Sequence, residues 1–88
     1  MSGKMRLLPW QGPDGKPCYL SADESGGGYL SRLADEVEEA QLDTGEEMLE
    51  LSGKLLQGPD ATSADELRFC VHRLREALRD ALRIARTR

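Results

Sequence analysis

The sequence has no asparagine, one isoleucine, one tryptophan and one histidine, and aromatic residues make up only 5% of its 88 positions. No apolar run approaches the roughly 18 residues that a membrane-spanning helix needs. The N-terminal residues, MSGKMRLLPWQGPDG, lack the sustained apolar stretch of a secretory signal. We therefore expect a cytoplasmic protein without a membrane span, and a core filled mainly by leucine and alanine.

Cysteine is scarce as well, because Cys18 and Cys70 are the only two. They could form one disulfide, but without a secretory signal free thiols are expected. Together with His72 they are the only soft or imidazole ligands. Cys70 and His72 lie two residues apart, roughly 200° around a helix axis, so they cannot bind one metal ion. We expect no metal site and no cofactor.

Residues for catalysis are also missing. His72 precedes Glu76 by four residues, which is typical of a surface pair on a helix. A dyad of Cys18 and His72 would need the fold to bring them together, and nothing in the sequence requires it. The glycine-rich SGGGY segment precedes a helix, as anion-binding segments do, but it lacks the Lys and Ser/Thr of a phosphate-binding loop. We predict that the chain is not an enzyme.

Charge, by contrast, is abundant and segregated along the chain. The net charge is −4, yet residues 23–50 hold ten acidic residues against the single basic residue Arg32. Residues 67–88 hold seven arginines against Glu76 and Asp80. The chain is thus acidic in its middle and basic at its end.

The first 22 residues predict a β-hairpin. The apolar runs KMRLLPW and KPCYLSA flank QGPDG, in which Pro13 suits the first corner of a type I turn and Gly15 a positive φ. Pro9 and Pro17 each remove a ladder donor and keep the strands short. A two-stranded hairpin is marginal alone, so it should pack on the rest of the chain, which follows a glycine-rich linker over residues 23–28.

A long helix is predicted over residues 29–57. Its seam recurs at steps of three and four: Leu30, Leu33, Ala34, Val37, Gln41, Thr44, Met48, Leu51 and Leu55. An acidic band lies opposite: Asp35, Glu36, Glu39, Asp43, Glu46, Glu47 and Glu50. Gly45 suggests a bend or a close helix approach. Gly58 is expected to cap the helix and Pro59 to prevent its continuation, so a turn follows over residues 58–63.

A second helix is predicted over residues 64–86, opened by a capping box of Ser63 and Glu66. Its expected seam is Leu67, Val71, Leu74, Leu78, Ala81 and Ala85. The short turn makes the two helices antiparallel. The fold class is therefore α+β, mainly α, with a β-hairpin followed by a two-helix hairpin in a single domain of residues 1–88.

One further stripe points to binding. Leu42, Leu49 and Leu56 stand roughly 80° to 120° from the main seam of the first helix, so one partner helix cannot cover both stripes. The β-hairpin with Trp10 and Tyr19, a second copy forming a four-helix bundle, or another protein would have to bury them. The same side carries a line of arginines on the second helix: Arg68, Arg75, Arg79 and Arg86. We predict a partner-binding face of these leucines and arginines, with Trp10.

These features favour a small non-enzymatic protein–protein interaction or regulatory module, a homodimer or the ligand of another protein. A nucleic-acid-binding regulator is the alternative, because arginine in the C-terminal helix suits phosphate. The pI near 4.9, the neighbouring acidic band and the lack of a helix-turn-helix argue against it. A basic helix lying on anionic lipid ranks third, because aromatic anchors are missing near the C-terminus.

The absence of asparagine, the single isoleucine and the preference for arginine over lysine are typical of GC-rich bacterial genomes. The run LPWQGPDGKPCYLSADESGGGYLSRLAD, residues 8–35, resembles small actinobacterial proteins of the streptomycete type. The resemblance covers the N-terminal part of the chain only. It implies no activity, so no functional residues are carried over from it.

Overall fold

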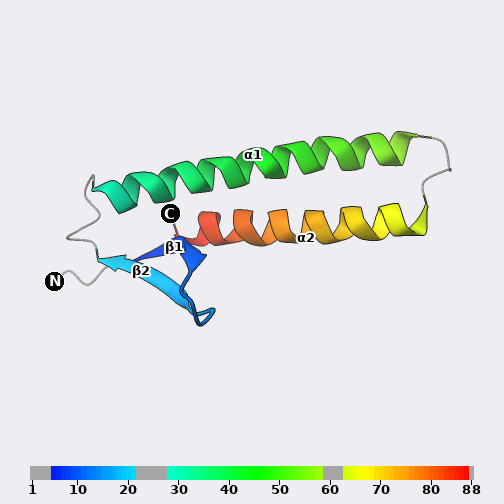
Figure 1. Cartoon of the computed structure of the whole chain (residues 1–88). Helices are drawn as coiled ribbons and strands as arrows, with labels where there is room; N and C mark the ends of the chain where they lie inside the picture. The colour runs from blue at the N-terminus through cyan, green and yellow to red at the C-terminus, as the bar shows by residue number, and fades with distance from the viewer. Residues whose placement is uncertain (1–4, 22–27, 59–62, 88) are drawn as a thin grey trace.

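The computed structural model describes residues 5–21, 28–58 and 63–87, which form a two-stranded sheet and two long helices (Figure 1). In chain order the elements are β1 (Met5–Gln11), β2 (Pro17–Ser21), α1 (Tyr29–Gln57) and α2 (Ala64–Thr87). The helices run antiparallel, and the sheet lies near the end where α1 begins and α2 ends (Figure 1). The predicted fold class, α+β and mainly α, is confirmed.

The turn of the β-hairpin has the predicted glycine conformation, since Gly15 has a φ of 78°. Gly12 binds across the turn twice: its N–H donates to the Lys16 carbonyl at 2.9 Å, and its carbonyl accepts from the Gly15 N–H at 2.9 Å. The Asp14 carboxylate accepts the Lys16 backbone N–H at 3.1 Å. Each turn residue thus has a backbone role, as expected of a hairpin turn.

The strands pair regularly only near the open end of the hairpin. Antiparallel pairing continues as far as Leu7 opposite Tyr19, and the register then shifts between Leu7 and Gln11. Pro9 lies within the shifted segment and has no N–H to donate to a ladder. The proline therefore explains why β1 is irregular before the turn.

The helix α1 is continuous over its 29 residues, about 43 Å. A Cβ placed on Gly45 would meet no atom within 4 Å, so the predicted close approach there is wrong. Gly58 follows the helix as its C-cap with φ −78° and ψ 176°, an extended conformation rather than the left-handed one common at this position. The expected linker glycines 26 and 27 and the turn residues 59–62 lie outside the described residues.

The predicted capping box opens α2. The Glu66 N–H donates to Ser63 Oγ at 3.1 Å, and the Ser63 N–H donates to Glu66 Oε1 at 2.9 Å. Two hydrogen bonds lower the pKa of Glu66. The larger effect comes from the bond with the Ser63 backbone, and the smaller from the bond with the Ser63 side chain. Two backbone donors at the start of the helix are satisfied, and α2 continues from there to Thr87.

The hairpin is held on α1 by a small apolar cluster. Leu8 of β1, Leu20 of β2 and Ala34 of α1 are buried together, and Trp10 and Cys18 pack against them. We call these five residues the hairpin cluster. The hairpin thus gains the support that two isolated strands lack in water.

A second cluster joins the two helices farther along. Met48 of α1 is buried with Cys70 and Ala77 of α2, and Leu55 and Leu74 pack against them. We call these five residues the helix cluster. Cys70 and Ala77 have small side chains, so α2 can lie close to α1 at this point.

The side of α2 that faces α1 differs from the predicted seam. The buried residues are Cys70, Ala77 and Ile84, seven residues apart, whereas the predicted seam members Val71 and Leu78 are each 60% exposed. The apolar arc of α2 is wider than one seam, and Cys70, Ala77 and Ile84 lie on its buried side. Val71 and Leu78 each follow one of these residues by one position and are therefore turned about 100° away from the contact.

The molecule is elongated and exposes a large surface. Its principal extents are 57 × 25 × 20 Å. The chain exposes 6836 Å², whereas a compact protein of 9.7 kDa exposes about 5,100 Å². The surplus of about 1,700 Å² shows that two helices and a hairpin leave much of the chain unburied. Within the described residues, no helix has both the length and the apolar content to cross a bilayer.

Candidate interaction face

Large apolar side chains line one side of the helical hairpin. They are Leu42, Leu49 and Leu56 on α1 and Leu67, Val71 and Leu78 on α2, and we call these six residues the leucine face. Leu49 is 72% exposed and Leu56 is 85% exposed, while Leu42 is half-buried. The described part of the chain therefore leaves most of this stripe in contact with solvent.

A groove shows that the two helices contribute to the same face. It has a volume of about 290 Å³. Its walls are Gln41, Leu42, Gly45, Glu46 and Leu49 from α1 and Leu74, Ala77, Leu78 and Ala81 from α2. Gly45 lines this groove without a side chain, and a Cβ placed there would meet no atom within 4 Å. Because residues seven or eleven positions apart lie on the same side of a helix, Leu56 of α1 and Val71 and Leu67 of α2 lie on the same side of the molecule as this groove.

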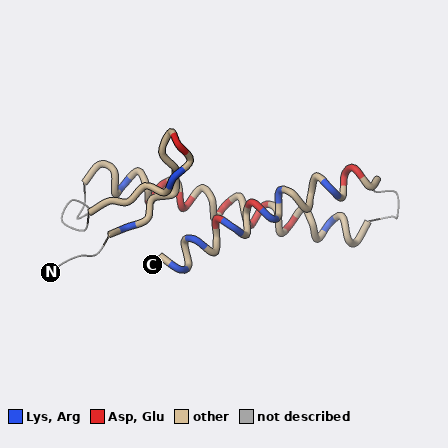
Figure 2. Tube along the Cα trace, turned by 90° about the horizontal axis from the view of Figure 1, so that it is seen from below, with Lys and Arg blue, Asp and Glu red and all other residues tan. Residues whose placement is uncertain are grey.

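Exposed acidic residues border the leucine face along α1. They are Glu39, Asp43, Glu46 and Glu50, and we call them the acidic border. At 100° per residue they follow Leu42 and Leu49 around the helix on the side away from α2. Figure 2 marks the charged positions along both helices.

Exposed arginines border the leucine face along α2. They are Arg68, Arg75, Arg79 and Arg86, the line predicted from the sequence, and we call them the basic border. Their positions follow Val71 and Leu78 around the helix on the side away from α1. The apolar face therefore lies between borders of opposite charge. The acidic border was missed as part of this face because the acidic band was assigned to the back of the first helix.

The β-hairpin does not cover the distal part of the leucine face. Trp10 packs in the hairpin cluster, and Tyr19 is mainly exposed. The expected alternative in which these two aromatic residues cap all three leucines of α1 is therefore wrong for Leu49 and Leu56.

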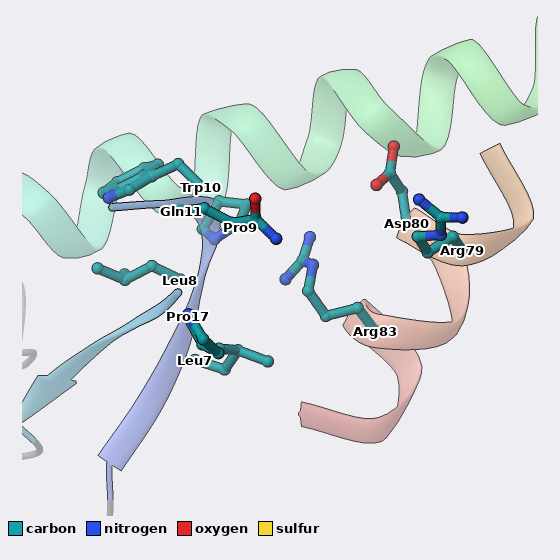
Figure 3. Close-up of a pocket in the computed structure, with 9 residues that line it drawn as sticks. All are labelled: Leu7, Leu8, Pro9, Trp10, Gln11, Pro17, Arg79, Asp80 and Arg83. Carbon is teal, nitrogen blue, oxygen red and sulfur yellow. The ribbon is translucent and has the colours of Figure 1, made fainter. Parts of the chain in front are cut away.

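Trp10 instead helps to line a cleft between β1 and the end of α2, with a volume of about 410 Å³. The other lining residues are Leu7, Leu8, Pro9, Gln11, Pro17, Arg79, Asp80 and Arg83. Arg83 extends from α2 toward the end of β1 (Figure 3). Of the predicted binding residues, only Trp10 and Arg79 meet at this cleft, and the cleft is separate from the groove of the leucine face.

An ion cluster not singled out from the sequence joins three elements. Glu38 of α1 is only 2% exposed. Its Oε1 pairs with Arg6 of β1 at 3.3 Å, and its Oε2 pairs with Arg83 of α2 at 3.3 Å. The sequence does contain a signal for this cluster: Glu38 comes four residues after the seam residue Ala34, so the helical period places its charge on the buried side of α1. Two guanidinium groups offset the desolvation of one buried carboxylate.

Both arginines of this cluster have additional acceptors. Arg6 donates to Asp35 Oδ1 at 2.7 Å and to Ser31 Oγ at 3.1 Å. Arg83 donates to Gln41 Oε1 at 2.6 Å. The network fixes the β-hairpin and the end of α2 on α1. It is therefore a structural clasp rather than an open site.

The cysteines and the histidine are separated by the fold. Cys18 is half-buried in the hairpin cluster and Cys70 is buried in the helix cluster, both as free thiols. His72 is exposed in the half of α2 that precedes the cleft-lining residues. Among the residues described, no three or more His, Cys, Asp or Glu side chains could hold a metal ion together.

Comparison with known proteins gives no relative for this arrangement: no family model matches the chain, and neither the curated proteins nor the solved structures contain a match. The leucine face and its two borders are therefore the features of the molecule that bear on its function.

Proposed function

We propose that this chain is a non-enzymatic protein–protein interaction module that binds a helical partner through its leucine face. The observation that carries the proposal is the exposure of Leu49, Leu56, Val71 and Leu78 on one side of a domain with surplus surface. Large exposed apolar patches on small proteins mark interaction sites. Burial of such side chains contributes about 1.5–3 kcal/mol each.

The arrangement of the face supports a protein partner. Protein interfaces combine an apolar centre with a polar, solvent-accessible rim. Here the leucine face supplies the centre, and the acidic and basic borders supply the rim. A partner with an apolar helical face and the opposite order of charges fits both, and a module of this kind is suited to a regulatory or scaffolding role.

A nucleic acid is the less favoured partner. The basic border could contact phosphates, but the acidic border lies on the same face and repels a polyanion. We expect no retardation of DNA or RNA in a gel shift at low salt. Retardation that Arg75→Glu abolishes would transfer the proposal to nucleic-acid binding.

Site-specific photocrosslinking in the cells that make the protein tests the proposal. A benzoylphenylalanine at Leu49 should give a discrete covalent adduct after irradiation, because Leu49 lies in the face. Glu47 is the matched control, since it is an exposed position of α1 outside the leucine face. Equal labelling at the two positions, or no adduct from either Leu49 or Leu78, would overturn the proposal.

A further inference from the structure

We infer that the leucine face binds a second copy of this chain, forming a four-helix bundle in which α1 of each copy packs antiparallel against α2 of the other. This inference rests on the proposed function and names its partner. It depends on three properties of the described residues: the exposed apolar side chains, the order of charges across the face, and the spacing of its leucines.

The face exposes the kind of side chain that a stable dimer buries. Leu49 and Leu56 are 72% and 85% exposed, and Val71 and Leu78 are each 60% exposed, and large apolar side chains of this kind form the buried core of a dimer interface. The face also extends along both helices from Leu42 to Leu56 and from Leu67 to Leu78. Pairing of two such faces would bury the apolar side that each two-helix hairpin leaves exposed to solvent.

The order of charges selects one arrangement of the two copies. In a twofold dimer each copy presents the same face to the other. An axis parallel to the helices places the acidic border of each copy against the basic border of its partner. An axis across the helices, in the plane of the interface, would place acid against acid and arginine against arginine. Only the first arrangement is electrostatically complementary.

The groove gives the expected register. It brings Leu42, Glu46 and Leu49 to the level of the α2 segment from Leu74 to Ala81. A twofold axis parallel to the helices leaves every residue at its own level. Glu46 of one copy therefore lies at the level of the partner's Arg75 and Arg79, and two such sets of pairs flank the apolar centre.

The spacing of the leucines fits the same bundle. Leu42, Leu49 and Leu56 are seven residues apart, and Val71 and Leu78 have the same spacing. A seven-residue apolar repeat is typical of helices that pack in left-handed supercoiled bundles. The buried seam inside the monomer, Cys70, Ala77 and Ile84, has this period as well. Each α2 thus carries one repeat for its own α1 and another for the partner.

Charge reversal combined with sedimentation equilibrium tests the inference. The wild-type chain should have twice its mass of 9.7 kDa. Asp43→Lys with Glu46→Lys makes the central pair of the acidic border basic, so that like charges meet at the centre of both borders. Arg75→Glu with Arg79→Glu has the opposite effect and brings acidic central pairs together. Each of these two double variants should raise the dimer dissociation constant by about 100-fold or more. An equimolar mixture of them should form a heterodimer, because both borders are then complementary.

A chain with all four substitutions is the decisive variant, because it exchanges the charges of the two central pairs and should form a homodimer again. Glu47→Lys with Glu76→Lys is the matched control, since it has the same change in charge at exposed positions of α1 and α2 on the side of the helices away from the leucine face. This control should dimerise like the wild type. Circular dichroism of every variant confirms that the helices are retained.

A wild-type chain that stays monomeric at about 100 µM would overturn the inference. So would a dimer that neither double variant weakens, because the copies would then be related by the other axis or by another surface. If the chain is monomeric but Leu49 crosslinks to a different protein, the proposed function stands and the second copy is wrong. If it is monomeric and Leu49 gives no adduct, both fail.

Discussion

The two ends of the helical hairpin bury their apolar residues in different ways. Where α1 begins and α2 ends, the β-hairpin supplies a further layer, and Leu8, Leu20 and Ala34 are buried beneath it. Toward the turn between the helices no such layer is present in the described residues, and Leu49 and Leu56 are exposed.

The difference shows what two helices can bury by themselves. A wide apolar arc needs more than one neighbour, because a single helix contact covers only a narrow seam. The β-hairpin supplies the extra layer at one end of the helices. Along the leucine face, a partner would have to supply it.

Removing the buried carboxylate should have the largest effect on stability. Glu38→Ala leaves Arg6 and Arg83 without their shared partner, and we expect a loss of about 3–5 kcal/mol in the free energy of unfolding. Urea denaturation followed by circular dichroism measures this loss. The triple replacement Arg6→Met, Glu38→Leu and Arg83→Met removes the charges together and should recover most of it. A single variant as stable as the wild type would show that the clasp does not hold the hairpin end.

The same truncation should have different effects at the two ends. Leu20→Ala, in the hairpin cluster, should destabilise the monomer by about 2–5 kcal/mol, because it creates a cavity. Leu56→Ala, at a solvent-exposed site, should change it by no more than about 0.5 kcal/mol. Both are measured by urea denaturation at a dilution where the dissociated chain predominates. Equal losses would contradict the distinction between a covered end and an uncovered one.

Filling the glycine of the groove should stabilise α1. A Cβ at Gly45 meets open space, so Gly45→Ala should increase the free energy of unfolding of the monomer by about 1 kcal/mol through helix propensity alone. Gly53→Ala, also open, is the control outside the groove lining and should have the same effect on the monomer. Thermal denaturation of both variants checks the prediction, and a destabilised Gly45→Ala monomer would indicate a contact that the structure does not have.

The smallest effect should come from the capping box. The hydrogen bonds with the backbone and the side chain of Ser63 lower the pKa of Glu66 in the folded state, so its stabilising contribution is fully present above the ordinary pKa of a glutamate. It is lost as the pH falls through the lowered pKa. The difference in unfolding free energy between the wild type and Glu66→Gln should therefore shrink on acidification from about pH 6 to pH 3. A difference that is constant with pH would contradict the role of the carboxylate.

Much of the fold was predictable because local signals decide it. Gly15 in the turn, the Ser63 and Glu66 box, and the three-and-four periodicity of α1 each specify a backbone conformation within a few residues. The fold class follows from their order along the chain.

The orientation of α2 was not predictable in the same way. Periodicity identifies the apolar arc of a helix but does not tell which part of a wide arc faces the neighbour. The small residues Cys70 and Ala77 face α1, and the larger Val71 and Leu78 are therefore exposed. Glu38 was missed for a related reason, because its two arginine partners come from β1 and from the end of α2 and are distant in sequence.

The molar mass of the chain in solution, measured before and after the charges of the central border pairs are exchanged, decides whether the leucine face of one copy covers that of another. We expect twice 9.7 kDa for the wild type, half of that for Asp43→Lys with Glu46→Lys, and the doubled mass again when Arg75→Glu and Arg79→Glu are added. A mass of 9.7 kDa for all three chains would contradict this expectation.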